Sequence, residues 1–311
     1  LGIRRSPVLD GRALASRLVS EGLQTIVFTR ARMTAEVLLT YMQDDARRQQ
    51  RDPRMVRGYR GGYLPTERRE VERGLRQGTV RAVVATNALE LGVDIGELAA
   101  VVMVGYPGTV ASMWQQMGRA GRRRAASLAV LVAGGGPLDQ FIVSHPEYFF
   151  GRSPEHALIN ADNPLILLGH LACAAFELPF AEGETFGGHE VTAHLQLLQE
   201  EGLLHRAAGV TYWLGDAYPA ESVALRATGM DAFTVVEAGS GRTIGRVERQ
   251  AAPSMIHEGA IYLHEGRSYQ VMRLDWEGRR AMMQPVEADY YTEASTSAHV
   301  QVIEERCRRE Q

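Results

Sequence analysis

Two arginines three residues apart form the strongest chemical signal in the sequence. The segment QQMGRAGRR at residues 115–123 sets Arg119 and Arg122 beside Gly118 and Gly121, which leave backbone room next to them. On a helix this spacing would place both guanidinium groups on one face, where they could grip two oxygens of a transferring phosphoryl group. The alternative is a solvated basic turn, which suits the two arginines that follow.

A second segment, VVATNALELGVDIG at residues 83–96, ends a predicted strand with groups that can hold a phosphate. The Thr86 hydroxyl and the amides after it can donate to phosphate oxygens, and Asn87 can cap the short helix expected there. Gly92 permits close backbone approach, and the Asp94 carboxylate can accept from a ribose hydroxyl or orient an arginine. Each feature alone is typical of an ordinary strand-to-helix turn. Together, about thirty residues before the arginine pair, they favour a phosphate site.

A third segment, TIVFTRAR at residues 25–32, places Thr29 and Arg30 at the carboxyl end of a predicted strand. Open α/β sheets bind ligands at that edge. A helix cap and a surface arginine explain the same residues about as well.

The elements that must position these residues alternate along the first half of the chain. Apolar runs at residues 25–29, 55–59, 80–86, 99–106 and 127–133 predict strands, and helical patterns occupy residues 31–50, 63–78 and 110–119. This alternation predicts an α/β unit with a mainly parallel sheet flanked by helices.

The second half has a different pattern. An apolar helix is expected at residues 166–178, and a helix at 188–204 followed by a hairpin at 205–215 predicts a winged-helix domain. From about residue 220, short alternating runs between glycine-containing turns predict a small antiparallel β domain. We therefore expect three domains, at residues 1–155, 156–218 and 219–311.

Composition excludes several classes of enzyme. All 34 lysine and arginine residues of the 311-residue chain are arginine, so a Schiff-base lysine and the phosphate-binding loop ending in G-K-[ST] are both excluded. Two cysteines, Cys173 and Cys307, are too few for a cysteine zinc site or a disulfide framework. His189 and His194 are five residues apart, about 140° around a helix, so we expect no metal site there.

Charge and hydropathy indicate the environment. Residues 1–155 hold 22 arginines against 15 acidic residues, a net charge of +7, whereas residues 156–311 hold 12 against 22, a net charge of −10. A basic half suggests a polyanionic partner. No apolar run is long enough to span a membrane, and we expect a cytoplasmic, nucleoid-associated protein.

In this order and at these separations, the three segments resemble motifs IV, V and VI of the second RecA-like domain of superfamily-two helicases. The stretches RGGYLPTERREVERGL and PLDQFIVSHPEYFFGRSPEHALINADNPLILLGHLACAAFELPF are similar to the bacterial repair-helicase branch that includes MrfA and SftH and is related to fungal RecQ-four-like enzymes. The stretch GAIYLHEGRSYQVMRLDWEGRRAMMQPVEADYYTEA resembles the downstream β domain of that branch.

The resemblance implies a RecA-like fold and a DNA-stimulated, ATP-dependent helicase or translocase that moves 3′ to 5′ on single-stranded DNA in repair. Arg119 and Arg122 would reach the γ-phosphate of ATP, and Gln115 would order the nucleotide or the attacking water. Gly92, Asp94 and Gly118 would line the nucleotide site, while Thr29, Arg30, Thr86 and Asn87 would hold strand phosphates.

The family's phosphate loop and acidic metal motif are missing here, so ATP and Mg²⁺ would be held mainly by an upstream RecA-like domain of the same polypeptide. We therefore expect Leu1 to be internal to a longer protein and the isolated chain not to hydrolyse ATP. We also expect the protein to be a monomer. Two alternatives stay open: a non-catalytic nucleic-acid-binding module, and an RNA helicase, because phosphate contacts do not distinguish the two sugars.

Overall fold

The computed structural model describes residues 5–91, 93, 95, 98–121, 126–156, 160, 163–223, 232–295, 297 and 301. The chain divides into two compact units. One joins residues 1–155 to residues 232–311, and the other consists of residues 156–231. The sequence-based division into three domains stays a prediction.

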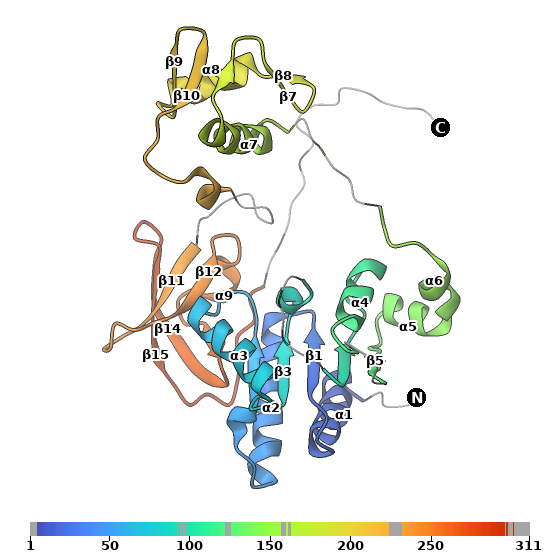
Figure 1. The fold of residues 1–311 in the computed structure, drawn as a ribbon. Coiled ribbons are helices and arrows are strands. Elements are labelled where there is room, and N and C mark those ends of the chain that lie inside the picture. Colours follow the sequence, from blue (N-terminus) through green and yellow to red (C-terminus); the bar gives the residue numbers. More distant parts are fainter. Residues whose placement is uncertain are drawn as a thin grey trace. The chain divides into compact units, whose positions relative to one another are not determined.

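The first unit contains a sheet of five parallel strands in the order β2-β3-β1-β4-β5 (Figure 1). Every residue of β1, β3 and β4 is buried, as is typical of a parallel sheet covered on both faces. Alternate side chains enter different cores, so Ile26 and Phe28 pack on one face and Val27 on the other. The strands are β1 (Thr25–Thr29), β2 (Val56–Tyr59), β3 (Ala82–Ala85), β4 (Ala100–Val104) and β5 (Leu128–Val132).

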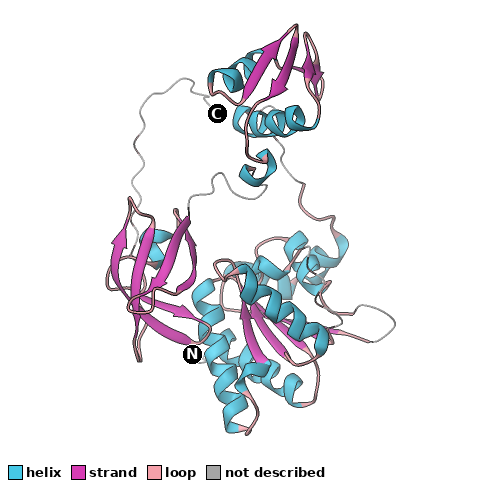
Figure 2. Cartoon of the chain, turned by 60° about the vertical axis from the view of Figure 1, so that its left-hand side comes forward, coloured by secondary structure: helices cyan, strands magenta, loops and turns pink. Residues whose placement is uncertain are grey.

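Helices cover both faces of this sheet (Figure 2). The helices α1 (Pro7–Ser20) and α2 (Arg32–Arg48) pack on the face that holds Val27. The opposite face is covered by α3 (Pro65–Gln77), α4 (Val110–Met117), α5 (Pro137–Ser144) and α6 (Pro146–Gly151). Two short 3-10 turns, η1 (Pro53–Met55) and η2 (Asn87–Leu89), complete this part of the chain. The α/β prediction is confirmed.

The same unit contains a second, mixed sheet in the order β12-β11-β15-β14-β13. The pairs are antiparallel as predicted, except that β11 and β15 run parallel. Buried side chains of these strands and of the short helix α9 form one core. The elements are β11 (Ala232–Glu237), β12 (Thr243–Glu248), α9 (Ala252–Met255), β13 (Ile261–His264), β14 (Arg267–Asp275) and β15 (Arg280–Pro285).

The second unit has the predicted winged-helix elements around a small apolar core. A two-residue turn at Ala208 and Gly209, with φ of 52° and 79°, joins β9 to β10, the geometry that favours a tight hairpin. The helix expected from residue 188 instead begins at Thr192, because the preceding residues form a short strand, β8. The elements are α7 (Pro164–Glu177), β6 (Phe180–Ala181), β7 (Thr185–Phe186), β8 (His189–Glu190), α8 (Thr192–Glu200), β9 (Leu204–Ala207), β10 (Val210–Trp213) and η3 (Pro219–Ser222). Among the described helices, none combines the length and hydropathy needed to cross a bilayer.

A buried ion pair between Arg60 and Glu36 lies where the two sheets of the first unit meet. The Arg60 Nε donates to Glu36 Oε1 at 2.6 Å, and the two side chains are only 2% and 3% exposed. Arg60 also donates to the carbonyl oxygen of Leu263 at 2.9 Å, and Tyr63 donates its hydroxyl to Glu36 at 2.8 Å. Burial lowers the pKa of Arg60, but Tyr262 and Glu36 more than offset this and raise it, so the guanidinium stays charged.

We predict that Arg60→Leu destabilises the chain by about 3–5 kcal/mol, because the Glu36 carboxylate would be left buried without its cation. The measurement is the free energy of unfolding in urea. Arg54→Leu is the control, since Arg54 pairs with Asp52 at 2.8 Å but is 85% exposed, and it should change stability far less. Equal losses in the two variants would contradict the assignment.

A second ion pair, between Arg12 and Asp45, joins α1 to α2. Asp45 accepts from Arg12 Nε at 2.8 Å and from the Ser16 hydroxyl at 2.9 Å. The hydrogen bond from Arg12 is the main cause that lowers the pKa of Asp45, against the opposing effect of burial.

Because the folded-state pKa of Asp45 is lowered, the stability it adds is present above its unfolded pKa of about 3.9 and is lost as the pH falls through the folded value. Asp45→Asn should therefore lower the melting temperature at pH 7, and the difference from the wild type should shrink as the pH falls below about 4. Asp44→Asn, on the same helix but 43% exposed, is the control. A difference that stays constant down to acid pH would contradict the prediction.

Candidate functional site

The carboxyl ends of the parallel strands carry three of the predicted site residues to one cleft. Thr29 is the last residue of β1 and Arg30 follows it, while Asn87 comes shortly after β3, the neighbouring strand. All three line a cleft of about 190 Å³, together with Phe28, Glu90, Gly105, Pro107, Ser112 and Gln116. Arg30 and Asn87 are exposed, whereas Thr29 is 5% exposed.

The fourth predicted strand-binding residue, Thr86, lies next to this cleft but does not line it. Thr86 is 5% exposed, and its amide donates to the Tyr59 carbonyl oxygen at 3.3 Å. The expectation that Asn87 caps a helix was wrong: Asn87 is the first residue of η2, and Thr86 is the residue before it, without a side-chain cap.

The β4 side of the cleft depends on a glycine and a buried carboxylate. Gly105 follows β4 with φ of +86°, a left-handed conformation that favours glycine. Asp139, 6% exposed, accepts from the amides of Tyr106 at 3.2 Å and Gly134 at 2.6 Å. These bonds tie the loop after β4 to the loop after β5, so the edge of the sheet is held in one shape.

A hydrogen-bonded carboxylate connects η2 to α4 beneath the cleft. Glu90, 8% exposed, accepts at Oε1 from the Ser112 hydroxyl at 2.6 Å and from Gln116 Nε2 at 2.7 Å. None of these three residues was predicted as a site residue from the sequence. The signals available were the glutamate inside LELGVD and the second glutamine of QQMGR, neither of which is distinctive before the helix is placed.

The start of α4 is capped twice. Thr109 accepts from the Ser112 amide at 3.0 Å, and the Glu155 carboxylate accepts from the amides of Val110 at 2.6 Å and Ala111 at 3.0 Å. These amide donors lower the pKa of Glu155, so the carboxylate stays charged beside the positive end of the helix.

Arg119 lies in a turn after α4, which corrects the expectation of a helical face. The helix ends at Met117 with Gly118 as its C-cap, so Arg119 and the residues up to Gly121 lie outside the helix. Gly121 has φ of +80°, and a Cβ there would collide with Ser127. The backbone is pinned by Gly121 N, which donates to the Leu98 carbonyl oxygen at 3.1 Å.

This turn contacts the segment after β3. Arg119 donates from a terminal guanidinium nitrogen to the Val93 carbonyl oxygen at 3.1 Å. The first and second sequence segments, residues 115–123 and 83–96, therefore meet in space. Gln115 is exposed, whereas the next residue, Gln116, is buried in the Glu90 network.

Three predicted residues, Gly92, Asp94 and Arg122, lie outside the described residues. Within the part of the chain that is described, no group of three or more histidine, cysteine, aspartate or glutamate side chains could hold a metal ion.

Family models match the sequence in two places. The model for the helicase conserved C-terminal domain matches residues 11–124, and the model for the winged helix domain of the ATP-dependent helicase HRQ1 matches residues 159–228. The first match contains all three segments, and the second coincides with the winged-helix elements of the second unit.

Similar proteins extend the likeness over nearly the whole chain. The "Uncharacterized ATP-dependent helicase YprA" of Bacillus subtilis is 48% identical over 307 residues, which is 98% of this chain and 41% of the relative. The ATP-dependent helicase HRQ1 of Saccharomyces cerevisiae is 35% identical over 300 residues, 93% of this chain and 28% of the relative. The chain thus spans less than half the length of these relatives.

Among solved structures, the DUF1998 helicase MrfA bound to DNA and AMPPNP is 48% identical, with a TM-score of 0.81 over 96% of this chain and 42% of that one.

We predict that Glu90→Ala destabilises the chain by about 1–3 kcal/mol for each donor left buried without an acceptor. Glu90→Gln is the matched control, because its amide oxygen can still accept a hydrogen bond, and it should lose less stability. The free energy of unfolding in urea measures both. A Glu90→Ala variant as stable as the wild type would show that the network does not hold α4.

Proposed function

We propose that this chain, which belongs to the MrfA and HRQ1 branch of superfamily-two DNA helicases, is part of an ATP-dependent motor that moves along single-stranded DNA. The observation that carries the proposal is the edge of the parallel sheet, where Thr29, Arg30 and Asn87 line one cleft. Support comes from the Arg119 contact to Val93, which joins two of the three helicase-like segments. The proposal includes 3′ to 5′ movement, a role in DNA repair and action as a monomer.

The single strand of DNA would lie across the carboxyl edge of the parallel sheet. Arg30 and Asn87 are exposed there and can contact successive phosphates of the DNA. The buried Thr29 and Thr86 would hold the ends of β1 and β3, from which Arg30 and Asn87 project. Opening and closing of a cleft against an upstream RecA-like domain would advance these contacts along the strand.

ATP would supply the energy of that movement, bound between this sheet and the upstream domain, which would hold Mg²⁺ and most of the triphosphate. Arg119 and Arg122 would bring positive charge to the γ-phosphate. Gln115, which is exposed, would order the nucleotide or the attacking water. Gly92, Asp94 and Gly118 would leave room for the nucleotide and orient it. The chain alone is not expected to hydrolyse ATP.

We predict that Arg122→Ala in the full-length protein lowers the DNA-stimulated ATPase rate by about 10³- to 10⁵-fold, because an arginine finger contributes about that much. Binding of single-stranded DNA should be largely retained. Arg123→Ala, at the neighbouring arginine expected to be solvated, is the control and should leave the rate near that of the wild type. Retention of more than about a tenth of the activity by Arg122→Ala would remove the finger assignment.

We also predict that Arg30→Ala weakens binding of the full-length protein to single-stranded DNA and reduces the slope of log K against log salt by about 0.7, the value for one phosphate on a single strand. Arg48→Ala is the control, since Arg48 lies in the last turn of α2, at the far end of the helix that follows Arg30.

Matched DNA and RNA oligonucleotides extend this measurement to the alternatives. Stronger ATPase stimulation by RNA would favour an RNA helicase, and binding without any ATPase stimulation would favour a non-catalytic module. An unchanged salt slope in Arg30→Ala would contradict the proposed strand contact.

A further inference from the structure

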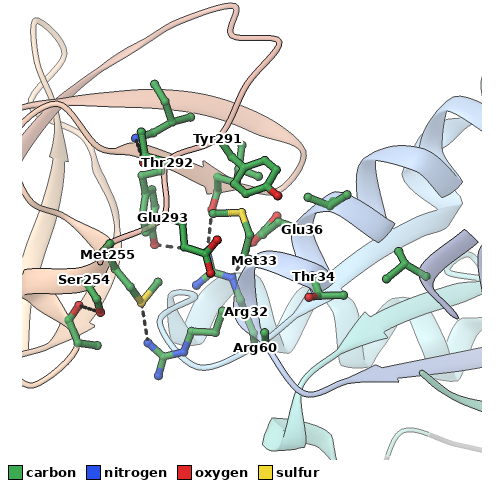
Figure 3. Close-up of a pocket in the computed structure, with 18 of the residues that line it drawn as sticks. Arg32, Met33, Thr34, Glu36, Arg60, Ser254, Met255, Tyr291, Thr292 and Glu293 are labelled. Atoms are coloured by element: carbon green, nitrogen blue, oxygen red, sulfur yellow. Dashed lines mark hydrogen bonds and ion pairs between the residues drawn. The ribbon is translucent and has the colours of Figure 1, made fainter. Parts of the chain in front are cut away.

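A large pocket lies between the two sheets of the first unit, apart from the cleft at the carboxyl edge. Its volume is about 860 Å³, within the range of about 300–1,000 Å³ typical of small-ligand sites. One wall is the first half of α2, and the other combines α9, β13 and residues 291–294 of the chain (Figure 3).

The pocket continues the proposed strand track. Thr29 and Arg30 line the cleft, and the next residues, Ala31 and Arg32, line the pocket. A DNA strand that contacts Arg30 would therefore pass close to Ala31 and Arg32, which line the pocket. Continuity of this kind favours the same strand as the occupant over an unrelated ligand.

The side chains of the pocket suit a flat, neutral group. Tyr41 and Tyr291 are 37% and 59% exposed, and Met33 and Met255 supply thioether surface on opposite walls (Figure 3). Aromatic side chains bind bases of single strands by stacking, whatever the base, and methionine sulfur packs favourably on rings. These four side chains can therefore enclose a nucleobase.

Charge in the pocket argues against a phosphate as the occupant. The Arg60 and Glu36 charges compensate each other in the buried pair, and the Arg32 guanidinium lies 3.6 Å from Glu248. Glu293 adds a further carboxylate to the lining. With no excess of positive charge, phosphates are better held at Arg30, outside the pocket.

Contacts within the protein hold the two walls of the pocket in place without a ligand. Arg60 bridges them through Glu36 on α2 and the Leu263 carbonyl oxygen on β13, and Tyr262 lies against the same guanidinium. A cavity held open by a buried ion pair costs little to reorganise when a base enters.

We propose that this pocket receives one unstacked base of the single strand that crosses the carboxyl edge of the sheet. The inference rests on the proposed function, because it requires that strand to be bound there. The DNA strand would then be bound through one of its bases as well as through its phosphates.

The test is an abasic scan with the full-length protein. A thymidine oligonucleotide and a series in which one base at a time is removed are bound to the wild type, to Tyr291→Ala and to Tyr290→Ala. Tyr290 is the matched control, since it is 57% exposed but does not line the pocket.

In the wild type, removal of one particular base should weaken binding by about 5- to 150-fold, the range expected for loss of one stacked base. Tyr291→Ala should weaken binding of the intact oligonucleotide and lose its sensitivity to that base, whereas Tyr290→Ala should keep both. Ser254→Trp, which fills the pocket from an exposed position of α9, should behave as Tyr291→Ala does.

An identical abasic profile in wild type, Tyr291→Ala and Ser254→Trp would overturn the base pocket. If binding still depended on Arg30, the proposed function would stand and only this inference would fail. Binding that does not depend on Arg30 either would contradict the strand track itself.

Discussion

The ion pair between Arg60 and Glu36 is the interaction on which the arrangement of the first unit depends. Two charges that are almost fully removed from water are stable only when each has its partner and its hydrogen bonds. Here Tyr63 and the Leu263 carbonyl oxygen supply further bonds. Around this pair, the Arg246 amide donates to the Gly62 carbonyl oxygen at 2.9 Å, and Arg57 pairs with Glu265 at 2.7 Å. The β-rich sheet is therefore joined to the parallel sheet, and a movement of one should carry the other.

The parallel sheet explains why residues far apart in the sequence share one edge. All five strands point the same way, so whatever follows each strand collects on the same side. The loops at that edge are then fixed by the left-handed backbone of Gly105 and by the hydrogen bonds of the Asp139 and Glu90 carboxylates. Phosphate-binding groups placed on such an edge need little reordering when a strand arrives, which is the physical basis of the proposed motor.

Much of the fold could be predicted from the sequence because burial on both faces leaves a strong apolar signal. Residues 25–29 and 99–106 are read as strands for that reason, and Pro65 with Gly78 marks both ends of α3. The helix α1 was missed, although Pro7 stands at its first turn, because its buried face includes the small residues Gly11 and Ala15, which give a weak apolar signal. The turn at Arg119 was mistaken for helix because its end is set by tertiary contacts, including the bridge between Leu98 and Ala120. Arg60 and Glu36 look like surface charges in the sequence, since only the folded chain brings positions 24 apart together.

The central claim is that a single strand of DNA crosses the carboxyl edge of the parallel sheet. Photo-crosslinking of the full-length protein to an oligonucleotide that carries 4-thiothymidine, followed by mass spectrometry of the linked peptides, tests it most directly. The account predicts crosslinks at residues 29–32 and 86–87 that disappear when unlabelled single-stranded DNA competes. Crosslinks confined to other parts of the chain, with none at that edge, would contradict it.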